Sequence, residues 1–149
     1  KTAKPSAPDS AIFTCPPRKA SACAEVLARL LAGEVLTSAD TLDKCATMRA
    51  AAHMDYLEKR YAWPVVSDRR ATGCTDGRVT IVAAYRLPQE TIAAARAAGG
   101  AAWCAEVRKA RAALRAKAAD AYRRAAALNK ARRNAAPPGQ SDLFAGGLA

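Results

Sequence analysis

Residues 21–87 read SACAEVLARLLAGEVLTSADTLDKCATMRAAAHMDYLEKRYAWPVVSDRRATGCTDGRVTIVAAYRL. Apolar residues recur at helical spacing in the first part of this stretch, and Gly33 then supplies a stop. The residues of this apolar stripe are Val26, Leu27, Leu30 and Leu31. They predict a first helix of about three turns. Two further helical patterns and a hairpin pattern follow, and this order of elements decides the fold.

The second helical pattern is short and begins after a polar cap. Thr37 and Ser38 precede the segment ADTLDKC, and their hydroxyl groups can accept hydrogen bonds from the first backbone N–H groups of a helix. The spacing places Ala39, Leu42 and Cys45 on one helical face. We expect Cys45 to be a small core residue.

The third helical pattern is the longest of the three. Thr47 can cap the segment TMRAAAHMDYLEKR, which continues to residue 60. The stripe expected to face inward consists of Ala50, Met54 and Leu57. The side chains expected to point elsewhere are those of Arg49, His53 and Arg60.

A hairpin pattern follows the third helix. Trp63 and Pro64 stop the helix, and WPVVSDRRATG then reads as a strand. The turn signal CTDG, residues 74–77, separates it from a second strand pattern, RVTIVAAYRL. Four arginines are expected near the tip of this hairpin or across from it, namely Arg69, Arg70, Arg78 and Arg86.

The segment from residue 26 to residue 87 resembles the winged helix-turn-helix domain common in bacteriophage and prophage proteins. The resemblance is carried by LARLLAGEVLTSADTL, by TMRAAAHMDYLEKR, and by WPV leading into a hairpin that closes with AAYRL. It implies that the second helix braces a DNA backbone and that the third enters the major groove. The residues that would then face base edges are Thr47, Met48, Arg49 and Ala51, with His53 one turn further on.

Contacts with the phosphate backbone are expected from the second helix, the end of the third helix, the hairpin and the helical extension. Cationic side chains and helix ends fix a protein on a duplex through such contacts. The residues expected to make them are Ser38, Lys44, Arg60, Arg69, Arg70, Arg78, Arg86, Arg108, Arg111 and Arg115.

Composition limits the other functional classes. The chain has 149 residues and a formal net charge of +11, which implies an acidic partner such as nucleic acid or an anionic surface. Five cysteines without a C-x-x-C pair and a single histidine argue against a zinc site or a disulfide framework, and we expect no metal and no cofactor. We expect no catalysis either, because acid, base and nucleophile motifs are lacking. Without a long apolar run, a cytoplasmic location near the nucleoid and no membrane association are expected.

The segments on either side of residues 21–87 differ from them in amino-acid composition. Residues 1–20 are rich in proline and small polar residues, which predicts a flexible arm. Residues 88–133 predict a short helix that ends at Gly99 and Gly100, followed by a long alanine-rich helix from about residue 101 to residue 133. Residues 96–133 carry eleven Lys or Arg against two acidic residues.

The apolar stripe of the long helix leaves three arrangements open. It can pack on the preceding domain, pair with the same stripe of a second copy to form a homodimer, or stay exposed and contact phosphates. The residues of the stripe are Trp103, Val107, Ala110, Leu114, Ala118, Ala121, Ala125 and Leu128. In all three arrangements, the clustered cations strengthen nucleic-acid binding and make it fall steeply with salt.

Residues 134–149 predict a disordered tail that follows the helix-breaking PPG sequence. The pentapeptide QSDLF, residues 140–144, resembles the motif by which bacterial replication proteins bind the sliding clamp. The resemblance implies that the Gln140 amide bonds at the rim of a clamp pocket, while Leu143 and Phe144 fill its apolar floor beside Asp142. The rival interpretation is that Leu143 and Phe144 fold back onto the body.

The sequence therefore predicts a mainly α protein with a small β-hairpin, a winged helix-turn-helix followed by a long basic helix and a disordered tail. The expected function is non-catalytic binding of double-stranded DNA, in the regulation of transcription or replication. The alternative is a protein-interaction module that binds the host sliding clamp or another protein through its tail without reading DNA sequence.

Overall fold

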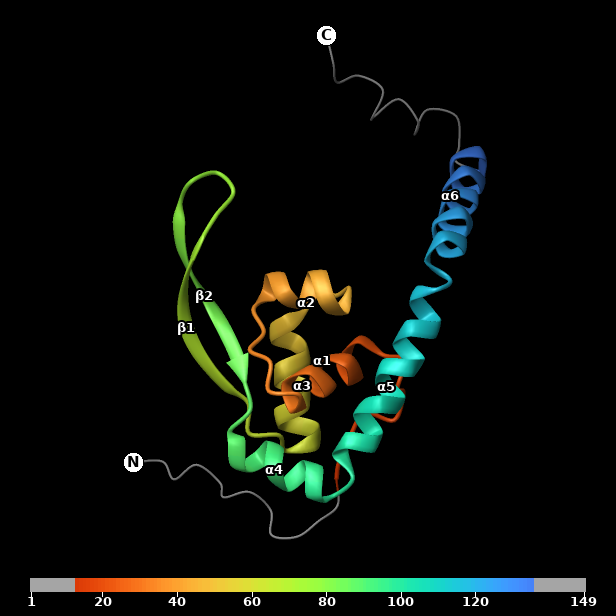
Figure 1. Cartoon of the computed structure of the whole chain (residues 1–149). Coiled ribbons are helices and arrows are strands. Elements are labelled where there is room, and N and C mark those ends of the chain that lie inside the picture. Colours follow the sequence, from red (N-terminus) through yellow and green to blue (C-terminus); the bar gives the residue numbers. More distant parts are fainter. Residues whose placement is uncertain (1–12, 136–149) are drawn as a thin grey trace. The chain divides into compact units, whose positions relative to one another are not determined.

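A computed structural model describes residues 13–135, which divide into two compact units. Unit 1 runs to Ala112 and unit 2 begins at Ala113. Unit 1 contains three helices, a two-stranded antiparallel hairpin and two more helices, as Figure 1 shows. The prediction of a mainly helical protein with a β-hairpin is confirmed.

The first three helices form where the sequence predicts them. They are α1 (Ala22–Leu31), α2 (Ser38–Cys45) and α3 (Ala50–Tyr61). The Ser21 hydroxyl oxygen caps α1 by accepting a hydrogen bond of 3.1 Å from the backbone N–H of Ala24. At the start of α2, Thr37 and Asp40 form a reciprocal capping box, which satisfies two backbone donors of the first turn.

Two details of the helix predictions are wrong. The buried residues of α2 are Thr41 and Cys45, whereas Ala39 and Leu42 are exposed, because one turn separates 41 from 45 and this pair faces α1. Thr47 does not cap α3, since α3 starts at Ala50 and has no side-chain cap. The inward stripe of α3 is confirmed, because Ala50, Met54 and Leu57 are all buried.

The hairpin consists of β1 (Val66–Gly73) and β2 (Val79–Arg86), paired from Val66 opposite Arg86 to Gly73 opposite Val79. Its base is tied to the helices, because Leu36 and Tyr85 exchange backbone hydrogen bonds of 2.9 and 2.8 Å. Its outer part extends beyond the core, and Val79 and Ile81 are 76% and 53% exposed.

The core is centred on α1, where Val26, Leu27 and Leu30 are fully buried. Burial of one such side chain contributes about 1.5–3 kcal/mol to folding. The core also takes residues from the helices that follow the hairpin, α4 (Gln89–Ala97) and α5 (Gly100–Arg115), the second of which lies in unit 1 up to residue 112. The contributing residues are Ile92, Ala95, Trp103, Cys104 and Val107.

The segment before α1 also packs on the core, in contrast to the flexible arm expected for residues 1–20. Phe13 makes edge-to-face contacts with Trp63 and Trp103, at centroid distances of 5.6 and 5.4 Å. The Trp63 indole N–H donates a 2.9 Å hydrogen bond to the carbonyl of Thr14, whose hydroxyl donates to the carbonyl of Tyr61. The ordered part of the domain therefore extends beyond residues 21–87 at both ends.

The long helix expected for residues 101–133 is two helices. A turn at residues 116–117 separates α5 from α6 (Ala118–Ala135), the only helix that lies wholly in the described part of unit 2. No residue of α6 is buried. Residues 113–135 carry Asp120 as their single acid and seven cations, namely Arg115, Lys117, Arg123, Arg124, Lys130, Arg132 and Arg133. Within residues 13–135, none of the helices is long and apolar enough to cross a membrane.

Candidate nucleic-acid interface

The N-terminal end of α3 presents a cation and a large apolar side chain to solvent. Met48 is 83% exposed, and Arg49 and Ala51 are also exposed. Within residues 13–135, no carboxylate forms an ion pair with Arg49. Buried Ala50 and Met54 hold the helix against the core. The end of α3 is therefore fixed in place while Arg49 is available to a partner.

Thr47 and His53 contact each other across the first turn of this helix. The Thr47 hydroxyl oxygen lies 3.0 Å from His53 Nε2 and accepts a 3.3 Å hydrogen bond from the backbone N–H of Arg49. Burial lowers the pKa of the half-buried His53 imidazole, and the charge of Arg49 lowers it further. The polar groups of Thr47 and His53 therefore make hydrogen bonds within this turn. Met48, Arg49 and Ala51 are the more exposed members of the predicted base-reading set.

The second half of α3 has a different charge. Asp55 and Glu58 follow there, and Asp55 forms a 2.8 Å ion pair with Lys59. Arg60, predicted to contact phosphate, is exposed at this far end of the helix. Any contact of α3 with a polyanion is therefore favoured at its N-terminal end.

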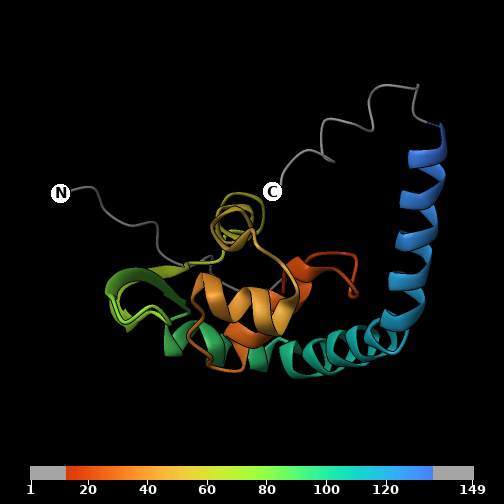
Figure 2. The same cartoon turned by 90° about the horizontal axis from the view of Figure 1, so that it is seen from above.

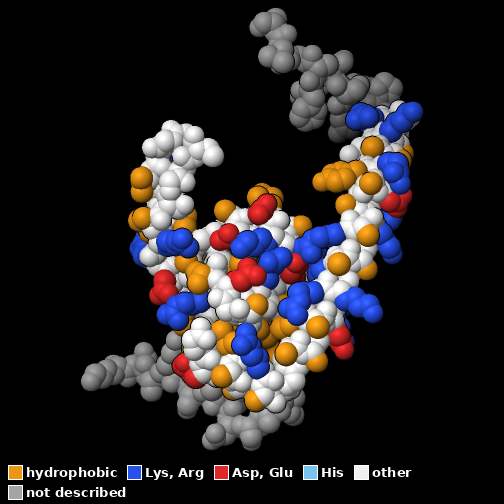
Figure 3. Space-filling model, viewed as in Figure 1, with side chains coloured by type: hydrophobic (Ala, Val, Ile, Leu, Met, Phe, Trp, Pro, Cys, Tyr) orange, Lys and Arg blue, Asp and Glu red, His pale blue; other side chains and the backbone are white. Residues whose placement is uncertain are grey.

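The predicted backbone contacts of α2 lie in acidic surroundings. Ser38 is the exposed first residue of α2, but Asp40 and Asp43 follow it within two turns. Lys44 is half-buried and lies 3.3 Å from a Glu34 oxygen and 3.8 Å from an Asp40 oxygen. In Figure 3, red acidic side chains lie among blue ones over α2. Phosphate contacts from Ser38 and Lys44 are less favourable than the sequence suggested.

The four hairpin arginines do not form one cluster. Arg69 and Arg70 are adjacent in β1, so their side chains leave opposite faces of the hairpin. Arg70 is close enough to α2 to help lower the pKa of Asp40, an effect dominated by hydrogen bonds from Thr37.

The other two hairpin arginines are paired with acids at opposite ends of the hairpin. Arg78 lies at the turn and pairs with Asp76 at 2.7 Å, an exposed contact that lowers the pKa of the carboxyl. Arg86 lies at the base, 2.9 Å from Asp68. The expectation that all four lie near the tip or across from it therefore fails for Arg86, because Arg86 is registered with the first residue of β1.

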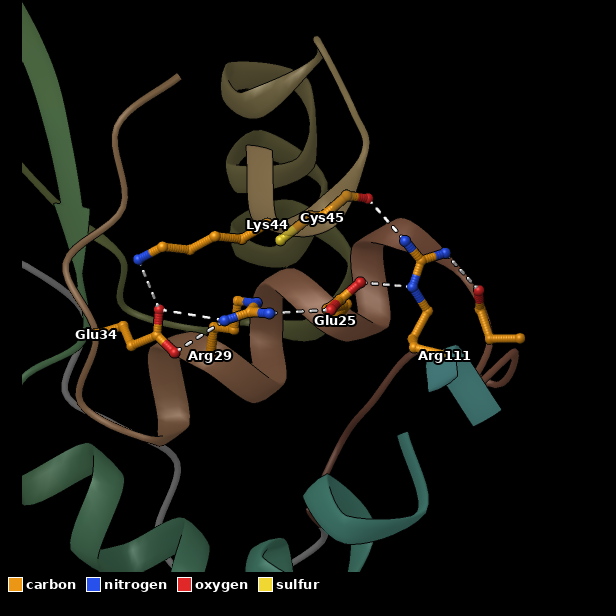
Figure 4. A network of polar contacts seen from close by, with 7 residues as sticks. Glu25, Arg29, Glu34, Lys44, Cys45 and Arg111 are labelled. Atoms are coloured by element: carbon orange, nitrogen blue, oxygen red, sulfur yellow. Dashed lines mark hydrogen bonds and ion pairs between the residues drawn. The ribbon is translucent and has the colours of Figure 1, made fainter. Parts of the chain in front are cut away.

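Arg111 was expected to contact DNA, and the structure contradicts this. Its guanidinium is buried and lies 2.5 Å from Glu25 Oε2, as Figure 4 shows. It also donates hydrogen bonds to the carbonyls of Ala20 and Cys45, at 3.0 and 2.7 Å. These bonds connect α5 to the start of α1 and to the end of α2. A guanidinium enclosed in this way cannot reach a phosphate.

The same network continues along α1 and was not predicted. Glu25, itself buried, contacts Arg29 at 3.3 Å, and Arg29 contacts Glu34 at 3.1 Å. In sequence, Glu25 and Arg29 have the four-residue spacing of an ordinary exposed helix pair. Nothing local marks Glu25 as buried, because its partner Arg111 is 86 residues away.

The remaining predicted contact residues lie in or beyond α5. Arg108 is exposed, and so is Arg115 at the end of that helix. The clamp-like residues Gln140, Asp142, Leu143 and Phe144 lie outside the described residues, so clamp binding stays a prediction from sequence. The homodimer formed through the alanine-rich stripe likewise stays a prediction.

The cysteines and acids supply no metal centre in the described part of the chain. All five cysteines are free, and no group of three or more His, Cys, Asp or Glu side chains within residues 13–135 could hold a metal ion. Burial raises the pKa of the Cys23 thiol to about 11, which is the behaviour of an unreactive core cysteine.

Comparison with known proteins adds no assignment. No protein-family model matches the chain, and neither curated proteins nor solved structures give a match.

Proposed function

We propose that the protein binds double-stranded DNA without catalysis, through a winged helix-turn-helix formed by α1 to α3 and the hairpin. The observation that carries the proposal is the N-terminal end of α3, where exposed Met48 and Arg49, which forms no ion pair within residues 13–135, directly precede a helix that Ala50 and Met54 hold against the core. Figures 1 and 2 support it, because α2, this end of α3 and the tip of the hairpin lie on one side of unit 1.

Each of these side chains suits a different part of a DNA groove. The Arg49 guanidinium can donate two hydrogen bonds to O6 and N7 of a guanine, the commonest specific contact in the major groove. Met48 can contact a thymine methyl group, and the small Ala51 lets the helix approach the base edges closely. The hairpin would act as the wing, with Arg69 and Arg70 on phosphates.

The cations of unit 2 fit the same partner by a different mechanism. Residues 113–135 carry seven cations and one acid, five of the cations on the exposed helix α6, and such a segment attracts a polyanion whatever its sequence. We therefore assign sequence reading to the N-terminal end of α3 and nonspecific affinity to α6. The resemblance to phage and prophage domains favours a regulator of transcription or replication.

The test is selection of bound sequences from a random duplex pool with the full chain, followed by affinity measurements on the enriched site. Arg49→Ala should weaken binding to that site by about 10- to 100-fold, the value of one bidentate base contact. Lys59→Ala is the matched control, because it removes one charge from the far end of the same helix. An equal loss in both variants, or an unchanged affinity in Arg49→Ala, would contradict base reading by α3.

The second candidate function is sliding-clamp binding through residues 140–144. The observation that favours it is the sequence QSDLF after a proline-glycine break. Phe144→Ala should abolish clamp binding while leaving DNA affinity unchanged, because a short linear motif acts independently of the folded domain. If the chain binds a clamp but no duplex, the interaction module is the correct function. If it binds duplex and no clamp, the tail assignment fails alone.

A further inference from the structure

A groove of about 390 Å³ lies between the end of α1, α4 and the first turns of α5. Its lining combines apolar surface from Leu31, Ala95, Ala101 and Cys104 with two cationic side chains, Arg96 and Arg108. All of these residues belong to unit 1. The volume falls within the range of about 300–1,000 Å³ typical of small-molecule sites.

Both guanidiniums belong to residues that line the groove, and no acid lines it with them. Among the described residues, neither Arg96 nor Arg108 forms an ion pair, and the groove lining contains no carboxylate. Both charges act on the same thiol, because burial raises the pKa of Cys104 and each arginine lowers it in part. Two like charges beside an apolar surface repel each other, so an anion between them would be stabilised.

The groove is separate from the proposed DNA surface. Figure 1 shows α4 and the start of α5 at the end of unit 1 opposite the N-terminal end of α3. In Figure 3, blue side chains flank orange apolar surface over this region. A ligand held here would leave the end of α3 free.

We propose that this groove binds a small amphipathic organic anion, with its carboxylate, sulfonate or phosphate between Arg96 and Arg108 and its apolar body against Leu31, Ala95 and Cys104. The positive charge of the two arginines selects ligands with an anionic group. The apolar floor of the groove selects ligands whose remaining part is apolar. A groove of about 390 Å³ is too small to hold a folded protein. The site goes beyond DNA binding and does not depend on it.

The experiment compares two fluorescent probes on the full chain. 8-Anilinonaphthalene-1-sulfonate has an apolar body and one anionic group, and N-phenyl-1-naphthylamine has nearly the same body without the charge. We expect the sulfonate to bind saturably at one site per chain. Arg96→Gln and Arg108→Gln should each weaken it about tenfold, the value of one charge-assisted hydrogen bond, and should change the uncharged probe less than twofold.

The controls separate the groove from general apolar exposure. Lys109→Gln removes a neighbouring charge of α5 that does not line the groove and should leave both affinities unchanged. Ala101→Trp should fill the groove and abolish binding of both probes, while cooperative thermal unfolding shows that the variant is folded. Backbone NMR shifts on adding the sulfonate should be confined to residues around Leu31 and Cys104.

Three results would overturn the proposal. Equal affinities of the two probes in every variant would mean that the arginines do not recognise the anion. Shifts elsewhere in the spectrum would mean that the probe binds another surface. Binding that appeared only after removal of residues 1–12 would mean that the chain's own N-terminal residues occupy the groove.

Discussion

Glu25 and Arg111 form the most enclosed charged contact among the described residues, with side chains 7% and 8% exposed. Removing one partner of such a pair leaves a buried charge without its closest counter-ion, which costs more than the pair itself contributes. Loss of Arg111 would weaken contacts of several elements at once, because its guanidinium also donates hydrogen bonds to the carbonyls of Ala20, before α1, and Cys45, at the end of α2. This side chain is therefore a structural centre of unit 1.

Arg111→Met should lower the free energy of unfolding by about 3–5 kcal/mol, measured by urea denaturation. The double variant Glu25→Gln with Arg111→Met should recover part of this loss, because it removes the charge of a buried carboxylate that has lost its closest guanidinium. Arg108→Met, one turn away and exposed, serves as the control and should change stability little. A loss below about 1 kcal/mol in Arg111→Met would show that the pair is not desolvated.

His53 should make stability depend on pH. Its pKa in the folded chain is below the ordinary value of 6.5, so the unfolded chain takes up the proton first as the pH falls. The contribution is complete above about pH 6.5 and is lost as the pH falls through the folded-state pKa. His53 is the only histidine, so His53→Gln should remove the loss of stability that begins as the pH falls below about 6.5. An NMR titration with an imidazole pKa at or above 6.5 would contradict this.

At the level of elements, the join between α4 and α5 depends on two glycines. Gly99 has a φ of 91°, a left-handed conformation that favours glycine. Gly100 is buried for a different reason, because a Cβ there would lie 2.7 Å from the carbonyl oxygen of Ala95 and 3.2 Å from Phe13 Cε2. The first contact is with backbone and cannot be relieved by a side-chain rotation.

Gly100→Ala should therefore force α4 and α5 apart and lower the free energy of unfolding by about 1–3 kcal/mol. Gly73→Ala, at the end of β1, is the matched control, since a Cβ there meets nothing within 4 Å. Thermal unfolding of the two variants measures the difference. If both variants unfolded at the same temperature, the close approach of the two helices would not be required.

The elements that the sequence predicted best are those with local signals. Thr37 and Gly77 mark a helix start and a turn through contacts within a few residues, and α2 and the hairpin lie where these signals put them. The break between α5 and α6 was missed, because residues 116–117 are Ala and Lys and contain no glycine or proline. The contacts of Phe13 and Arg111 were missed because they join residues far apart in sequence.

The candidate interface was predicted only in part, for the same reason. The resemblance to winged helix-turn-helix domains implied a base-facing set around the start of α3, and three of its members, Met48, Arg49 and Ala51, are exposed there. Whether a cation is free depends on acids brought from other elements, as Lys44 and Arg86 show. Sequence periodicity carries no information on such partners.

At the level of the whole molecule, the folded unit extends well past the hairpin. A chain ending at residue 90 should lack cooperative thermal unfolding, because it loses Trp103, Val107 and the partner of Glu25. Loss of one buried tryptophan alone costs about 3–5 kcal/mol, against a typical total stability of about 5–15 kcal/mol. A chain ending at residue 115 keeps these contacts and should unfold cooperatively. Cooperative unfolding of the shorter chain would show that α5 is dispensable.

The charge of α6 should appear in the salt dependence of duplex binding by the full chain. Replacing Arg123, Arg124 and Lys130 by Gln should lower the slope of log affinity against log salt by up to about 3, since each released phosphate contact contributes about 0.9. Replacing Arg96, Arg108 and Lys109 removes as many charges from unit 1 and should lower the slope less. Equal slopes for both triple variants would contradict a phosphate-binding role for α6.

The position of Arg111 also bears on the order in which the chain folds during its synthesis. Translation releases a protein from its N-terminus, so α1, with Glu25 on its inner side, leaves the ribosome long before α5 does. Until residue 111 emerges, Glu25 lacks the guanidinium of Arg111, and the carbonyl of Ala20, just before α1, lacks the hydrogen bond from the same side chain. Until then the three helices and the hairpin also lack the core residues of α5, Trp103, Cys104 and Val107, so we expect the domain to complete its core only after α5 has been synthesised.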